Sequence, residues 1–131
     1  MHNIFYKNKF IFYFCNIVLI IFYLYPGSIF GYFLYGDLKI QPQLTKDFII
    51  SSNHFYVFCI ISIIGFFTYK EIKKIKLLII YLIFLSIILE IFHLFIPNRG
   101  FEFSDLFGNL LGSLVVIVIN YLIRNYANFK N

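Results

Sequence analysis

Glu90 and His93 lie three residues apart within an apolar stretch of the sequence. Residues at this spacing share one face of a helix, so the two side chains are expected to point the same way. A carboxyl group beside an imidazole can exchange a proton with a substrate, or it can supply two ligands to a metal ion. Glu90 and His93 are therefore the first candidates for a functional site.

Four further polar residues lie in or near apolar stretches. Asp105 and Asn109 are four residues apart, a spacing that also places both side chains on one helix face. His54 stands near the start of another apolar stretch, and Arg99 lies in a short polar segment. A guanidinium group can bind a phosphate or a carboxylate through two parallel hydrogen bonds, which makes Arg99 a candidate for binding an anionic group.

Composition and hydropathy predict the elements that hold these residues. Of the 131 residues, 61% are hydrophobic and 13% are charged, whereas a soluble globular domain carries about 25% charged residues. The mean hydropathy is +0.84. The 23% aromatic content argues against a disordered chain. The sequence thus excludes an ordinary soluble enzyme and predicts an integral membrane protein.

Four continuously apolar stretches are each about long enough to cross a bilayer as a helix, which takes about 20 residues. None alternates with a period of two, so a transmembrane barrel is not expected. Pro26, Gly27 and Ser28 are expected to kink or end the first helix. The prediction is an all-α, polytopic membrane protein, a four-helix transmembrane bundle in one domain over residues 1–131, with helices at residues 10–33, 48–69, 77–96 and 105–123.

Basic residues predict the orientation of this bundle. Eight of the 11 lysines and arginines fall on one side of the four predicted helices. Cytoplasmic loops are enriched in these residues, so this side and both termini are expected in the cytoplasm. The eight residues are Lys7, Lys9, Lys70, Lys73, Lys74, Lys76, Arg124 and Lys130.

In this orientation, polar side chains from three helices lie at a similar depth near the outer face: His54, Glu90, His93, Asp105 and Asn109. A charged group costs about 2.5–3.5 kcal/mol at the centre of a transmembrane helix and less near the interface. Glu90 is therefore expected to face the bundle interior, with Arg99 or His54 as its partner. Two interpretations stay open, an interhelical clamp that fixes the fold and a polar pocket that opens to the outer leaflet.

Gly108 and Gly112 form a G-x-x-x-G motif in the last predicted helix. Small residues at this spacing let two transmembrane helices approach closely. The motif is expected to pack this helix against the predicted helix at residues 77–96, and so to bring its polar side chains toward Glu90.

Metal and nucleic-acid chemistry are both disfavoured. Glu90 and His93 resemble half of a di-metal carboxylate site, but the sequence has no second E-x-x-H pair, so no metal and no other cofactor is expected. Nucleic acid is not expected as a partner, because the sequence has no glycine-rich phosphate loop and no dense arginine patch.

The segment from Glu90 to Gly112 resembles the VanZ-like family. That family combines an acidic residue, an arginine after a short turn, a Ser/Asp helix start, an asparagine four residues on and a glycine three beyond. The positions that match in order and spacing are Glu90, Arg99, Asp105, Asn109 and Gly112. His54 and Phe55 match a His-Phe pair at the start of an earlier helix of the family, so the resemblance covers residues 54–112.

Two places depart from the family pattern. His93 stands where the family has a glutamine, and this difference argues against a metal role shared across the family. Ile50 and Ser51 stand where the family has an Asp-Lys pair. A function that depends on that lysine is therefore not implied for this chain.

The resemblance implies a small multi-pass protein of the bacterial inner membrane, in a family associated with resistance to teicoplanin-type glycopeptides. We expect a site that binds or handles an envelope lipid or another amphiphile, and we expect Arg99 to contact the headgroup of that ligand. Glu90, Asn109 and His54 are expected to line the polar end of a groove. An intramembrane acid/base enzyme acting on a lipid-linked substrate and a structural subunit with a membrane-protein partner are the alternatives.

Overall fold

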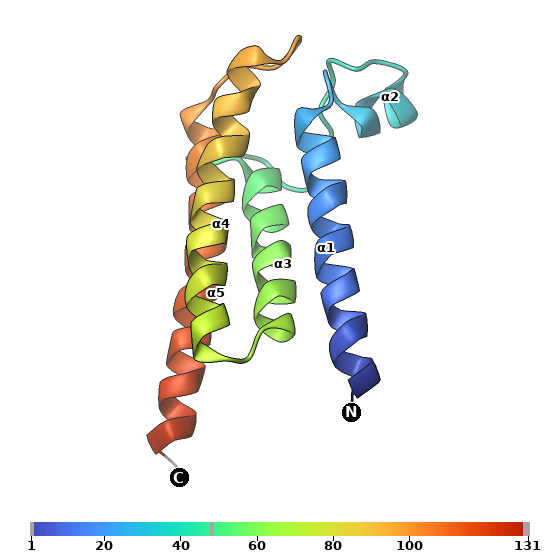
Figure 1. The fold of residues 1–131 in the computed structure, drawn as a ribbon. Helices are drawn as coiled ribbons and strands as arrows, with labels where there is room; N and C mark the ends of the chain where they lie inside the picture. The colour runs from blue at the N-terminus through green and yellow to red at the C-terminus, as the bar shows by residue number, and fades with distance from the viewer. Residues whose placement is uncertain (1, 48, 130–131) are drawn as a thin grey trace.

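The computed structural model describes residues 2–47 and 49–129, and the regular elements in this part of the chain are all helices. They are α1 (His2–Leu24), α2 (Ile29–Tyr35), α3 (Ser52–Thr68), α4 (Ile72–Phe92), the short 3₁₀ helix η1 (His93–Phe95) and α5 (Phe103–Phe129). The long helices run along a common direction, and α1 begins at the same end of the bundle at which α5 finishes (Figure 1). The expected helix start at Phe48 and the basic residue Lys130 lie outside the described residues.

Two helical segments are long and apolar enough to cross a membrane. They are Ile72–Phe95, which joins α4 and η1, and Phe103–Ala127 in α5. The segment Asn8–Leu24 of α1 gives a third candidate span if it is taken together with α2. Helix α3 is apolar but only 17 residues long. The helices thus support a membrane protein, with two or three spans by length and composition.

The predicted helix at residues 10–33 is wrong in its second half. Helix α1 ends at Leu24, and α2 is bent away from it by 74°. Gly27 has a φ of +108°, a conformation that residues with a Cβ rarely adopt. Ser28 then starts α2, because its Oγ accepts a hydrogen bond from the Gly31 N–H at 3.0 Å. The break expected at Pro26–Ser28 therefore separates two helices.

The other helices differ from the prediction at their ends. Helix α4 begins at Ile72 rather than residue 77, and α5 extends from Phe103 to Phe129 rather than over residues 105–123. The prediction ended each helix at the first charged residue. Lysine and arginine are good helix formers, and near a helix end their long side chains can place the charged group in water. A helix can therefore continue through them.

Helix α3 lies at the centre of the packing, with its most extensive contact to α5 and a smaller one to α1. A Cβ on Gly112 would lie 2.4 Å from the Phe55 carbonyl oxygen, and one on Gly108 would lie 2.7 Å from that of Ser51. The G-x-x-x-G motif therefore packs α5 against α3, and its expected packing against residues 77–96 is wrong. Helix α4 contacts a neighbouring face of α5, where the Ser86 and Ser113 hydroxyls lie 3.4 Å apart.

Candidate functional site

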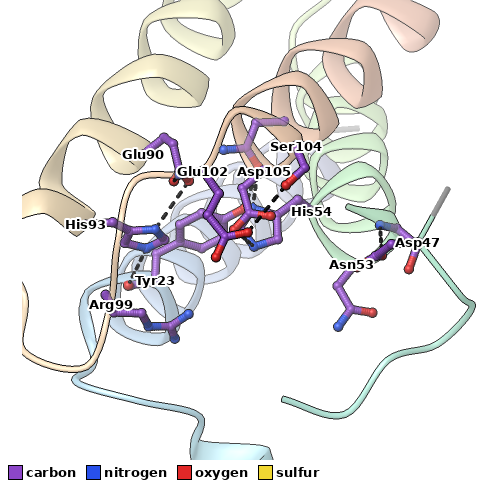
Figure 2. A network of polar contacts seen from close by, with 12 residues as sticks. Tyr23, Asp47, Asn53, His54, Glu90, His93, Arg99, Glu102, Ser104 and Asp105 are labelled. Carbon is purple, nitrogen blue, oxygen red and sulfur yellow. Dashed lines mark hydrogen bonds and ion pairs between the residues drawn. The ribbon is translucent and has the colours of Figure 1, made fainter. Parts of the chain in front are cut away.

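Six side chains meet at the end of the bundle where α1 and α4 finish and where α3 and α5 begin. We call them the polar cluster: Tyr23, His54, Glu90, His93, Asp105 and Asn109. Glu90 and Asn109 are completely buried, and the Asp105 side chain, the most accessible of the six, is 19% exposed. Labelled members of the cluster converge on one region between the helix ends (Figure 2).

Local backbone structure positions the cluster residues. The Ser51 N–H donates to the Ser104 carbonyl at 3.1 Å, which ties the start of α3 to the start of α5. Asp105 follows Ser104 directly, and His54 lies three residues after Ser51, so the hydrogen bond brings their side chains together. At the end of α4, the α-helix continues directly into the 3₁₀ helix η1, and His93 keeps helical backbone angles. The predicted common face of Glu90 and His93 is thereby retained.

Tyr23 is the centre of the cluster. Its hydroxyl donates to Asn109 Oδ1 at 2.5 Å, and its ring stacks on His93 with 5.6 Å between centroids and 16° between planes. The sequence interpretation missed Tyr23. It lies in the last turn of α1, at the depth of the other cluster residues, and this depth is the one signal that could have found it. With 11 tyrosines in the chain, residue type alone does not single it out.

The hydrogen bonds of His54 fix which ring nitrogen carries a proton. Nδ1 lies 2.9 Å from the Tyr23 hydroxyl oxygen and 3.2 Å from Asn109 Oδ1. Because the Tyr23 proton is already directed to Asn109, both oxygens can act only as acceptors toward this nitrogen, so Nδ1–H is the donor. Nε2 then faces Asp105 Oδ2 at 3.3 Å.

His93 is arranged in the same way. Its Nε2 lies 3.0 Å from the Tyr23 main-chain carbonyl, which can only accept, so Nε2 carries a proton. Its Nδ1 faces Glu90 Oε2 at 3.3 Å (Figure 2). Glu90 Oε1 accepts from the Glu102 N–H at 2.9 Å. Oε2 is buried and has no hydrogen bond to any described residue.

Two imidazoles thus face two carboxyl groups. In each imidazole, one nitrogen donates a hydrogen bond elsewhere and the other nitrogen faces the carboxyl group. This arrangement can hold a proton between each imidazole and its carboxyl group. It can also hold a metal ion, because one donor atom each from His54, Glu90 and Asp105 lies within 4.8 Å of the others. The expected His54 partner of Glu90 is therefore near, although His93 is closer to its carboxylate.

Arg99 does not pair with Glu90 or Asp105, contrary to the expectation. Its Nη2 donates to the main-chain carbonyls of Gly27 at 2.7 Å and Phe22 at 3.3 Å, and Nε donates to that of Tyr25 at 3.3 Å. A cation at the last carbonyls of a helix is favourable, so Arg99 fastens the end of α1. Burial lowers the pKa of the Arg99 guanidinium, while the neighbouring Tyr23, Asp105 and Glu90 oppose that change.

Two cavities adjoin the cluster. An apolar cavity of about 630 Å³ lies among α1, α2, α3 and residues 41–44, and Tyr23, His54, His93 and Arg99 form its polar end. A polar cavity of about 340 Å³ lies beside it. Both are lined by His93 and Arg99. Glu90 and Asn109, which were expected to line the groove, are not among the residues that line either cavity, because Tyr23 and the histidines lie in front of them.

Comparison of the chain with known protein families, with curated proteins and with solved structures finds no match. The resemblance to the VanZ-like family therefore rests on the spaced residues between His54 and Gly112 alone.

Proposed function

We propose that the chain is a VanZ-like membrane protein in which α1, α3, α4 and α5 all span the bilayer. Helix α3 is about 25 Å long at 1.5 Å per residue, close to the roughly 30 Å hydrocarbon core. The basic residues near the ends of α3, α4 and α5 opposite the polar cluster support cytoplasmic termini. The polar cluster then lies near the outer face of a bacterial inner membrane.

We further propose that the protein binds a membrane amphiphile, such as an envelope lipid or a lipid-linked precursor. The observation that carries this proposal is the apolar cavity, which ends at a set of polar side chains, two of which, His93 and Arg99, also line the polar cavity. Its volume of about 630 Å³ lies within the range of small-molecule sites. Its walls come from apolar side chains of α1 and α3, including Val18 and Val57.

Arg99 is the residue that would select the headgroup. It lines both cavities, and its Nη1 makes no hydrogen bond to the described residues. Lys39 adds a second cation to the wall of the polar cavity. A phosphate or carboxylate headgroup fits these two cations, while the chain of the amphiphile lies along α1 and α3. This ligand class agrees with the glycopeptide resistance that the family resemblance implies.

The test is mass spectrometry of the lipids that co-purify with the full chain in detergent. Val57→Trp and Val18→Trp place a large ring in the apolar cavity and are expected to lower the bound lipid at least fivefold. Val118→Trp is the matched control, because Val118 is 52% exposed on α5 and does not line the cavity. Arg99→Ala is expected to change which headgroups are retained.

Equal lipid retention by all these variants would contradict the proposal. The alternative of a structural subunit predicts that result, because in that case the cavity has no occupant. Thermal unfolding of each variant in the same detergent separates loss of lipid from loss of fold.

A further inference from the structure

We propose that the polar cluster binds one divalent transition-metal ion through His54 Nε2 and the carboxylates of Glu90 and Asp105. One donor atom from each of the three residues lies within 4.8 Å of the other two. The three residues come from α3, α4 and α5, so the ion would join the helices that form most of the bundle. This inference does not depend on the amphiphile and goes beyond it.

The unsatisfied oxygen of Glu90 is the second observation that points to a ligand. Oε2 is buried in a side chain with 0% exposure and has no hydrogen bond to the described residues. His93 Nδ1 lies 3.3 Å from it, but this nitrogen carries no proton when Nε2–H donates to the Tyr23 carbonyl. Leaving a buried polar group unpaired is unfavourable, and more so for a charged group. A bound cation would satisfy this oxygen.

The spacing of the donor atoms fits a metal ion. Bonds of about 2.0–2.1 Å to a tetrahedral ion place neighbouring ligand atoms roughly 3.3 Å apart. His54 Nε2 and Asp105 Oδ2 lie 3.3 Å apart. Glu90 supplies the third donor atom, which lies within 4.8 Å of the other two. Small movements of the Glu90 side chain would close the set of three ligands.

The residues behind these ligands have the arrangement that metal sites use. A histidine ligand donates its other N–H to an oxygen acceptor, which fixes the ring and leaves the first nitrogen free for the metal. His54 does this through Nδ1–H, which Tyr23 and Asn109 accept. His93 has the same pattern, with its Nε2–H on the Tyr23 carbonyl.

Charge also favours a divalent ion. Two ionised carboxylates balance one divalent cation, so the occupied cluster would be neutral in a region where net charge is costly. The nitrogen and carboxylate donors suit Zn²⁺, Mn²⁺ or Fe²⁺. Asp105 lines the polar cavity, which offers the ion a route to the cluster.

The test uses the full chain in detergent micelles after treatment with EDTA. Zn²⁺ binding is measured by calorimetry, and bound metal is counted by elemental mass spectrometry. We expect one Zn²⁺ per chain. Glu90→Gln keeps the Oε1 acceptor for the Glu102 N–H and is expected to weaken Zn²⁺ binding at least tenfold. Glu71→Gln is the matched control at the N-cap of the same helix, where the acid is exposed, and it should bind Zn²⁺ as the wild type does.

Zn²⁺ is also expected to raise the Tm of the wild type and to leave that of Glu90→Gln unchanged. Absence of stoichiometric Zn²⁺ in the wild type, or equal binding by Glu90→Gln, would overturn the proposal. If Glu90→Gln does not fold, Asp105→Asn decides the question by the same tenfold criterion. Val57→Trp should lose lipid but keep Zn²⁺, so failure of the metal site and failure of the amphiphile site are distinguishable.

Discussion

Asn109 connects α5 to three other helices, and replacing it with alanine should destabilise the bundle. Its Oδ1 accepts from the Tyr23 hydroxyl at 2.5 Å and from His54 Nδ1 at 3.2 Å, and its Nδ2 donates to the Ser86 carbonyl at 3.2 Å. Side-chain hydrogen bonds between membrane helices average about 0.6 kcal/mol each. The unpaired Tyr23 hydroxyl adds about 1 kcal/mol or more. Asn109→Ala should therefore cost about 3 kcal/mol.

The free energy of unfolding can be measured by SDS titration in mixed micelles, with far-ultraviolet circular dichroism as the signal. Asn120→Ala is the matched control, because Asn120 is on the same helix and its Oδ1 accepts from Arg124 Nε, one turn away on that helix, at 3.0 Å. A pair of this kind is worth about 0.5 kcal/mol or less. The difference between the two variants isolates the interhelical contacts.

A double-mutant cycle with Tyr23→Phe tests the central contact directly. Tyr23→Phe removes the hydroxyl and keeps the ring, so the two changes should couple by about 0.6–1.7 kcal/mol. Additive effects, or an Asn109→Ala cost equal to that of Asn120→Ala, would refute the inference that Tyr23 joins α1 to α5 through Asn109.

Three further variants test how the site is positioned. Gly112→Ala should lower the free energy of unfolding by about 1–3 kcal/mol, because the new Cβ would lie 2.4 Å from the Phe55 carbonyl oxygen. Gly100→Ala is the control and should be near neutral, because a Cβ on Gly100 meets no atom within 4 Å. Gly27→Ala should cost about 1–3 kcal/mol because φ is +108° there, and hydrogen exchange of the Ser28 amide should speed up. Arg99→Ala should raise hydrogen exchange in the last turn of α1, because the guanidinium binds the Phe22 carbonyl in that turn and the Tyr25 and Gly27 carbonyls just after it. Unchanged exchange would contradict the inference that Arg99 stabilises this helix end.

Composition and depth predicted more of the structure than the motifs did. Charge content and hydropathy predicted an all-helical membrane protein, and the described helices support that class. Counting residues from the helix ends placed His54, Glu90 and Asp105 at one level, and the structure places their donor atoms within 4.8 Å of one another. Depth follows from the rise of a helix, so it can be read from sequence spacing.

The choice of partners could not be predicted in this way. Gly108 and Gly112 define a helix face, but spacing does not say whether α3 or α4 lies against it. Arg99 was expected to pair with an acid, whereas it binds carbonyls that became free because α1 stops at Leu24. That stop depends on the backbone of Gly27 and its surroundings. Tertiary contacts of this kind require the positions of all helices at once.

The origin of the polar cluster in four separate helices has a consequence for biosynthesis. A chain is made from its N-terminus, so in the proposed four-span arrangement α1, α3 and α4 would enter the bilayer before α5 supplies Asp105 and Asn109. Until then, the Tyr23 hydroxyl and the His54 Nδ1–H would lack the Asn109 oxygen that accepts from both. The newly inserted chain would therefore pass through an intermediate with unsatisfied polar groups in lipid, where such groups are costly. Substitutions in the cluster should consequently reduce the amount of protein in cells before they alter what the folded protein binds.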